Sequence, residues 1–293
     1  MRVSSLTWGG CTIPGDGGVL AVAVSLTGPT AAHARAQARH AIDAGADVLE
    51  LRVDLLEEVD ALVAFTEAPG EEPSTTDSMV VTTAAAQVLE CLRRMADVVD
   101  VTPLLLTCRT AAEGGRARLD DSGYGALLCS VLDELAGWEP GRRPSAIDVE
   151  VQRGCLPQVS EQAHGLGIDV VASFHDFKTT PADDVLEDVL SRMASEGADL
   201  AKIAVWPTGA DDVARLLGVC ARATAAPGKG TGLGLPVAAM SMGALGAVSR
   251  VAPVFGSALT FAVVPDEQGE TQASAPGQLP IQDVRRCLEL LRA

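Results

Sequence analysis

The chain has 293 residues, and 47% of them are hydrophobic, which supplies a large core and excludes wholesale disorder. Its 39 acidic residues outnumber 22 basic ones, and the resulting formal net charge of -17 argues against binding to nucleic acid or to an anionic membrane. No apolar run approaches the ~18 residues of a membrane-spanning helix, and no secretory signal is expected. Seven scattered cysteines, none in a CxxC pair, argue against disulfides and a zinc site and favour a cytoplasmic location.

Short apolar segments alternate with helical patterns along the chain. In chain order, strands are predicted at residues 19–26, 47–53, 103–107, 146–151, 168–174, 200–205, 236–240 and 254–262. Helices are predicted at residues 31–44, 84–99, 124–135, 156–164, 181–196, 210–221 and 284–291. Eight strands alternating with helices indicate an α/β fold, a single-domain (β/α)8 TIM barrel over residues 19–293, with a doubly wound sheet as the alternative. Residues 1–18 are interpreted as an N-terminal extension and the polar segment near 67–78 as a surface insertion.

Charged residues stand at the ends of two predicted strands, where the chemistry of such a barrel lies. The second strand ends with Glu50, Arg52 and Asp54, which alternation along a strand places on one face. The fourth strand carries Asp148 and Glu150 in the same way. Apolar neighbours around the first group favour burial and hence a functional role, with a solvated edge strand as the alternative.

One histidine and one lysine stand out further along the chain. His175 directly follows the apolar fifth strand, and histidine titrates near neutral pH; a histidine that merely packs in the core is the alternative. Lys202 lies inside the sixth strand, in a chain that has only three lysines among its 22 basic residues. Burial disfavours the charged form of an amine, and a neutral amine is the nucleophile that condenses with ketones. The alternative is a lysine that is paired or that reaches the mouth of the barrel.

Two other motifs are weak. The glycine-rich segment 228–232 resembles a phosphate-binding loop, but the first glycine of that motif is missing and a strand follows it. A metal site at His175 and Asp176 would lack further ligands at the ends of strands. Neither motif is assigned a function.

In combination, the motifs of residues 19–292 resemble the type I 3-dehydroquinate dehydratase family. No single motif is diagnostic, but their order is specific. They are Glu50-Leu51-Arg52-Val53-Asp54, Arg109 with Glu113-Gly114-Gly115, Asp148-Val149-Glu150, Ser173-Phe174-His175-Asp176-Phe177, Lys202-Ile203-Ala204, Met240-Ser241-Met242-Gly243, Ser249-Arg250, Phe255-Gly256-Ser257 with Thr260-Phe261, and Ser274-Ala275-Pro276-Gly277-Gln278.

The resemblance implies a barrel enzyme of the shikimate pathway, often a homodimer, that needs no metal or cofactor and converts 3-dehydroquinate to 3-dehydroshikimate and water. It implies that Lys202 forms a Schiff base with the ring ketone, that His175 acts as general base and then acid, and that Glu113 orients His175. Arg250, with Ser274 and Gln278, would hold the substrate carboxylate, and the loop from Ser274 to Gln278 would close over it. The substrate-binding residues that it implies are Ser25, Glu50, Arg52, Arg109, Met240, Met242, Arg250, Phe261, Ser274, Ala275 and Gln278.

The chain departs from the family pattern at two places. Ala244 and Leu245 stand where charged residues are common, and the segment from Arg250 to Phe255 is one residue shorter than expected. Two other functions compete with the dehydratase: an aldolase that also uses an imine-forming lysine, and a catalytically silent protein that binds the same metabolite. The pairing of His175 with Asp176 and the Arg250 segment argue against the aldolase, and the presence of both Lys202 and His175 argues against a mere binder.

Overall fold

The structure of the protein is a computed structural model that describes residues 5–15, 18–63, 78–99, 102–225, 232–265 and 272–291. The insertion predicted near residues 67–78 lies outside this set except for Ser78, where a helix begins. The glycine-rich segment 228–232 also lies outside it, apart from its last residue.

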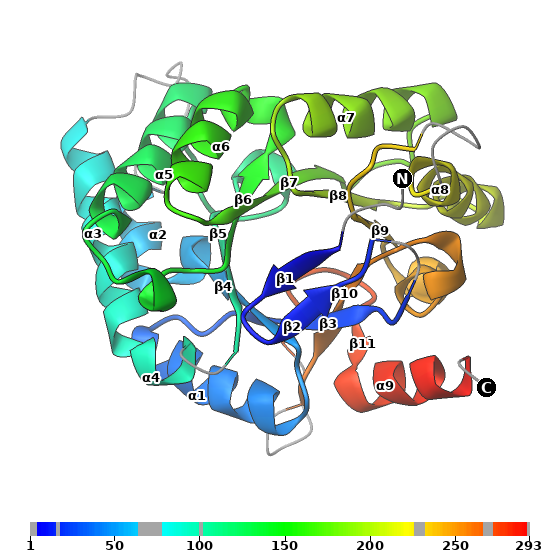
Figure 1. Ribbon diagram of the computed structural model, residues 1–293, viewed down its shortest axis with the longest axis horizontal. Coiled ribbons are helices and arrows are strands. Elements are labelled where there is room, and N and C mark those ends of the chain that lie inside the picture. The colour runs from blue at the N-terminus through cyan, green and yellow to red at the C-terminus, as the bar shows by residue number, and fades with distance from the viewer. Residues whose placement is uncertain are drawn as a thin grey trace.

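Eight parallel strands curl into a barrel, which confirms the predicted fold class (Figure 1). They are paired in chain order, and a short ninth strand, β11, pairs with the edge of β10 opposite β3. Between β9 and β10 the closure is reduced to a bridge from Val237 to Ser257 and a hydrogen bond of 2.7 Å from the Ala258 N–H to the Val237 carbonyl. The strands are β3 (Ala21–Leu26), β4 (Val48–Arg52), β5 (Leu104–Thr107), β6 (Ala146–Glu150), β7 (Asp169–Asp176), β8 (Leu200–Val205), β9 (Val237–Ser241), β10 (Leu259–Val263) and β11 (Leu279–Pro280).

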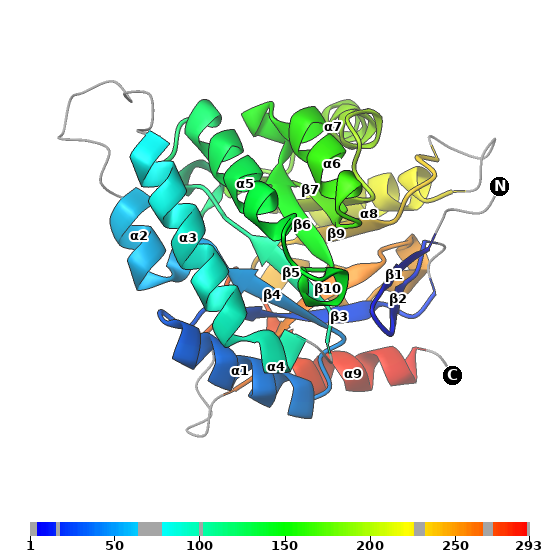
Figure 2. The same ribbon diagram turned by 60° about the vertical axis from the view of Figure 1, so that its left-hand side comes forward.

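Helices surround the barrel on the outside (Figures 1 and 2). Their amphipathic faces bury residues such as Leu186, Leu190 and Met193, which recur at the spacing of helical turns. The α-helices are α1 (Ala31–Asp43), α2 (Glu57–Val63), α3 (Ser78–Arg94), α4 (Ala96–Val99), α5 (Asp121–Leu135), α6 (Leu156–Gly165), α7 (Asp183–Ser195), α8 (Ala210–Ala223) and α9 (Ile281–Leu290). The 3-10 helices are η1 (Val53–Leu55), η2 (Ala111–Glu113), η3 (Pro140–Arg142), η4 (Val151–Arg153), η5 (Ala244–Arg250) and η6 (Pro253–Phe255).

The connection between β9 and β10 differs from the other strand–helix units. It contains η5 and η6 in place of an α-helix, and the strand predicted from residue 254 begins only at Leu259. Gly256, at φ +92°, ends η6, and its position is crowded because a Cβ there would lie 1.8 Å from the Thr224 hydroxyl oxygen. The apolar residues before it, Val254 and Phe255, are exposed, and they predict a strand because composition alone does not distinguish an apolar turn from a short strand.

A hairpin at the N-terminus closes one end of the barrel. Strands β1 (Leu6–Trp8) and β2 (Cys11–Ile13) pair antiparallel within the segment that the sequence indicated only as an extension. Trp8 and Ile13 pack against the small inward-facing residues of the strands, and the Trp8 indole donates a hydrogen bond of 2.8 Å to Asp169, the first residue of β7. The hairpin therefore covers the N-terminal ends of the strands and leaves the C-terminal ends for the site.

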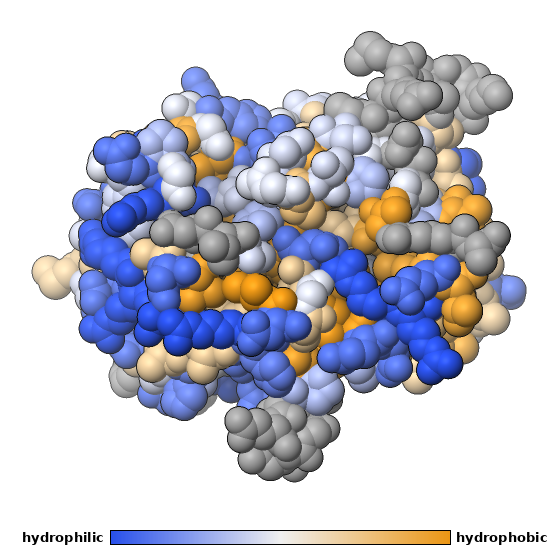
Figure 3. Space-filling model, turned by 60° about the horizontal axis from the view of Figure 1, so that its bottom comes forward, coloured by the Kyte–Doolittle hydropathy of each residue, from blue (hydrophilic) through white to orange (hydrophobic). Residues whose placement is uncertain are grey.

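The outer face that Figure 3 shows is mostly hydrophilic, with hydrophobic residues gathered in a band between the polar rows. Within the described ranges, no helix is both long and apolar enough to span a bilayer.

Candidate active site

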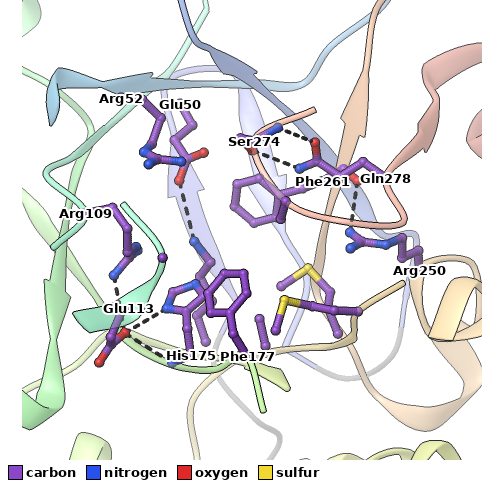
Figure 4. A pocket seen from close by; sticks show the side chains of 16 residues that line it. Glu50, Arg52, Arg109, Glu113, His175, Phe177, Arg250, Phe261, Ser274 and Gln278 are labelled. Atoms are coloured by element: carbon purple, nitrogen blue, oxygen red, sulfur yellow. Dashed lines mark hydrogen bonds and ion pairs between the residues drawn. The ribbon is translucent and has the colours of Figure 1, made fainter. Parts of the chain in front are cut away.

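A cavity opens at the C-terminal ends of the barrel strands (Figure 4). Its walls come from residues far apart in sequence, because parallel strands bring all their carboxyl ends to one face of the barrel. The lining residues are Glu50, Arg52, Arg109, Glu113, Gly114, His175, Phe177, Lys202, Ala204, Met240, Met242, Arg250, Phe261, Ser274, Ala275 and Gln278.

Lys202 reaches this cavity from the middle of β8, with 5% of its surface exposed. Its Nζ lies 3.5 Å from Glu50 Oε1 and 3.4 Å from Asp148 Oδ2. The nitrogen also lies 4.4 Å from the centre of the Phe261 ring, whose face attracts a cation. The amine is therefore buried, paired with carboxylates and in contact with the cavity. The pairing was one of the alternatives that the sequence left open for this lysine, and it does not exclude access to the cavity.

His175 and Glu113 form a buried pair at the side of the cavity. The histidine Nδ1 lies 2.8 Å from Glu113 Oε2, which also accepts the His175 backbone N–H at 3.1 Å. Burial, together with the charges of Arg109, Lys202 and Arg52, lowers the pKa of His175 well below 6.5. Burial also raises the pKa of Glu113 to about 8. The imidazole is held neutral because its charged form is disfavoured by burial among cations.

Arg109 is the centre of a buried ionic network below the cavity. Its guanidinium donates hydrogen bonds to Asp148 at 2.8 Å, to Glu150 at 3.1 Å and to Ser173 at 2.9 Å. It also lies 3.6 Å from Glu113. Three carboxylates on this one cation, all buried, hold the floor of the site in a single arrangement.

Glu50 and Arg52 face the cavity from β4, as the alternation of that strand predicts. Asp54 does not line the cavity; it holds Arg52 through two hydrogen bonds of 2.8 and 2.7 Å, a bidentate pair. Ser25 lies behind Glu50 and donates a hydrogen bond to its Oε2. Ser25 thus lies one residue away from the cavity wall, in contrast to the other predicted binding residues, all of which line it.

Arg250 differs from the other arginines of the site. It is 1% exposed, and its hydrogen bonds go to two backbone carbonyls, those of Phe261 at 3.4 Å and Pro276 at 3.1 Å. Across the described parts of the chain, no carboxylate pairs with it, and its Nε finds no acceptor. Burial lowers the pKa of Arg250 to about 10. A buried cation with no counter-ion at the wall of a cavity is a site for an anion.

The loop from Ser274 to Gln278 covers the Arg250 side of the cavity. The Gln278 side chain accepts the Ser274 backbone N–H and donates to the Ser274 hydroxyl, both at 3.0 Å, and that hydroxyl donates to Ser25 at 2.8 Å. Gly277, at φ +80°, lies so close to Gly243 that a Cβ would sit 2.4 Å from its carbonyl oxygen. The loop is therefore held over the cavity at both of its ends.

Three lining residues, Gly114, Phe177 and Ala204, were not among the predicted site residues. The position of Ala204 could have been predicted from the sequence, because it stands two residues after Lys202 and therefore on the same face of β8. The Phe177 ring stacks on the His175 ring, with 6.5 Å between the ring centres, and a Cβ on Gly114 would lie 2.3 Å from it. Phe177 follows the end of β7, and its contact with Gly114 is a tertiary one that no local pattern announces.

A closed α/β barrel with a buried lysine, a histidine–glutamate pair and an unpaired arginine around one cavity defines an enzyme that acts on a small anionic molecule. A family model described as Type I 3-dehydroquinase matches residues 22–293. The chain belongs to this family, which confirms both the predicted family and the predicted class of enzyme, a hydro-lyase.

Similar proteins agree with that assignment. The chain is 34% identical to a 3-dehydroquinate dehydratase of Klebsiella pneumoniae over 275 residues and 33% identical to one of Listeria monocytogenes over 273 residues, with 92% of both chains covered in each case. The solved 3-dehydroquinate dehydratase of Geobacillus kaustophilus superposes with a TM-score of 0.79 at 26% identity, covering 100% of this chain and 98% of the other. The type I enzyme of Clostridium difficile, solved with covalent modified comenic acid, gives 0.77 at 28% identity, covering 98% and 97%.

Proposed function

We propose that this protein dehydrates 3-dehydroquinate to 3-dehydroshikimate and water through a Schiff base on Lys202. The observation that carries the proposal is the single cavity that holds a buried lysine amine, a neutral imidazole and an unpaired guanidinium in a chain of this family. Each of the three meets one chemical need of the substrate, namely its ketone, the proton next to that ketone, and its carboxylate.

Lys202 supplies the nucleophile. Its Nζ gives a proton to the neutral His175 imidazole and attacks the ketone carbon. His175 returns that proton to the ketone oxygen, which leaves the adduct as water, and the resulting iminium withdraws electrons from the neighbouring C–H bond. The enamine that forms when that proton leaves expels the β-hydroxyl group as water, and hydrolysis of the iminium then releases the product and restores the amine.

His175 moves the protons. Because Nδ1 is bound to Glu113, Nε2 is the nitrogen that remains to face the substrate. A neutral imidazole accepts the proton from the carbon next to the iminium, and the same nitrogen then gives a proton to the departing hydroxyl. Glu113 orients the ring, and in its ionised form it accepts the Nδ1–H, which leaves the lone pair of the imidazole on Nε2. Because the pKa of Glu113 is raised to about 8, this form of the pair grows as the pH rises towards that value.

Arg250 binds the substrate carboxylate, with Ser274 and Gln278 from the covering loop on the same side. Glu50 and Arg52 bind ring hydroxyls, and Met240, Met242 and Phe261 supply the apolar walls. Arg109 is already bound to three carboxylates, so its part is chiefly to hold the floor of the site.

A reductive trapping experiment tests this function. Borohydride added with 3-dehydroquinate should leave the reduced ligand covalently on the peptide that contains Lys202, and mass spectrometry locates it. Lys178→Arg changes one of the other two lysines and should be trapped as well as the wild type, whereas Lys202→Arg should not. Substrate that binds without turnover or trapping would support the catalytically silent binder instead.

The resemblance to the family also leads us to propose a homodimer in the cytoplasm. All seven cysteines are free, which fits a reducing compartment. Light scattering coupled to size exclusion measures the mass in solution, and a particle of 30.1 kDa, the mass of one chain, would contradict the dimer.

A further inference from the structure

A second carboxylate lies against the amine of Lys202, on the side away from the cavity. Asp148 has no exposed surface and does not line the cavity, yet its Oδ2 is 3.4 Å from Lys202 Nζ. Its other oxygen, Oδ1, accepts hydrogen bonds from Arg109 at 2.8 Å and from Ser173 at 2.7 Å. The carboxylate is thus held in place by two donors and presents its remaining oxygen to the lysine.

Glu50, the other carboxylate near Nζ, is placed differently. Its Oε1 accepts a hydrogen bond of 3.0 Å from Thr107, its Oε2 accepts one from Ser25, and it faces the cavity where the substrate binds. A bound substrate competes with Lys202 for Glu50. Nothing that enters the cavity reaches Asp148, so this carboxylate stays beside the nitrogen throughout the reaction.

The charge of Asp148 is secured by its surroundings. Burial alone would raise the pKa of its carboxyl, but Arg109, Lys202 and the hydrogen bonds from Ser173 and Arg109 lower the pKa below its usual value. A fully buried anion that is fixed next to a nitrogen favours the protonated state of that nitrogen.

We propose that Asp148 is the counter-ion of the iminium that Lys202 forms with the substrate ketone. This inference rests on the proposed Schiff-base function. When Nζ bonds to the ketone carbon and water leaves, the iminium nitrogen retains one N–H and a positive charge, and Asp148 stabilises both. Removal of the neighbouring proton by His175 moves an electron pair onto this nitrogen, and loss of the hydroxyl restores the positive charge, so the same carboxylate serves both steps.

The test measures the protonation of the imine directly. Cyanoborohydride reduces protonated imines, whereas borohydride also reduces neutral ones, so the ratio of the two trapping yields across a pH series gives the midpoint at which the imine loses its proton. In Asp148→Asn, an isosteric change, we expect this midpoint to fall by about 1 to 3 pH units, the effect of one opposite charge at this distance. Turnover should fall by about tenfold or more at neutral pH, while KM changes little because Asp148 does not touch the substrate.

Ser173→Ala is the matched control. It removes the hydrogen bond that Ser173 donates to the same carboxylate and the one that it accepts from Arg109, without changing any charge, so the midpoint should move much less than in Asp148→Asn. Asp148→Glu restores a carboxylate and should recover part of the shift. A variant that lost activity only because its fold is disturbed would show a lower melting temperature with an unchanged midpoint.

Two results would overturn the inference. One is an Asp148→Asn midpoint equal to that of the wild type. The other needs no variant: it is a wild-type imine that loses its proton at the same pH as the imine formed by the same ketone with a free alkylamine, rather than at a higher pH. Absence of any trapped ligand in the wild type would instead contradict the proposed function itself.

Discussion

Arg250 is a buried cation that has no counter-ion among the residues that the structure describes, so its replacement should affect substrate binding without lowering the stability of the fold. Burial lowers its pKa from 12.5 to about 10, which corresponds to about 3 kcal/mol against the folded state at neutral pH. Its two hydrogen bonds to backbone carbonyls return about 1 kcal/mol each. In Arg250→Met, whose side chain has a similar length, these effects nearly cancel, so we expect the free energy of unfolding to stay within about 1 kcal/mol of the wild type.

Binding should respond differently. A buried, charge-assisted contact to a substrate carboxylate is worth about 2 to 5 kcal/mol, so KM should rise roughly 30-fold or more in Arg250→Met. Urea unfolding and steady-state kinetics on the same preparation measure the two effects.

Arg52→Met is the matched control, because Arg52 is also buried but forms a bidentate pair with Asp54. Its loss leaves the Asp54 carboxylate buried without a cation, with only the backbone N–H groups of Arg109 and Arg116 donating to it, which costs about 3 to 5 kcal/mol of stability. If Arg250→Met destabilised the protein as much as Arg52→Met, or left KM unchanged, the interpretation of Arg250 as an unpaired anion receptor would be wrong.

Three further predictions concern His175 and its neighbours. His175→Ala should lower kcat by about 10²-fold or more while some ligand is still trapped on the lysine, and an unchanged kcat would remove His175 from the mechanism. Because the pKa of Glu113 is raised to about 8, the folded state holds a proton that the unfolded state has lost, and the free energy of unfolding should fall as pH rises from 6.5 to 8. Below pH 6.5 the lowered pKa of His175 makes the free energy of unfolding change with pH in the opposite direction. Urea unfolding measured between pH 6.5 and 8 should show that Glu113→Gln abolishes the fall. Gly114→Ala and Gly45→Ala each place a side chain at positive φ, and the backbone strain should lower the free energy of unfolding by about 1 to 2 kcal/mol in each. Only Gly114→Ala displaces the Phe177 ring. Equal kcat/KM values for the two variants would therefore contradict a role for that ring.

Much of the fold follows from the sequence alone. The alternation of short apolar strands with amphipathic helices predicts the barrel, and the exception between β9 and β10 arises because apolar turn residues and strand residues have the same composition. The hairpin around Trp8 could not be predicted, because strands of three residues are too short to show an alternation of apolar and polar residues.

The sequence predicts those residues of the candidate site whose position depends on a single strand. Glu50 and Arg52 share a face by alternation, and Lys202 stands out because a lysine inside an apolar strand is rare in this chain. These are properties of single elements, and the sequence determines them through periodicity and burial.

Which charged groups meet was decided only by the tertiary structure. Glu113 and His175 are 62 positions apart, Arg109 binds one carboxylate from η2 and two from β6, and Arg250 has no carboxylate partner among the described residues. Periodicity tells which face a residue occupies, but the partner across the barrel depends on strand register, curvature and the path of the loops. The chemistry of this protein lies in those pairings, because a counter-ion or its absence determines what each buried group can do.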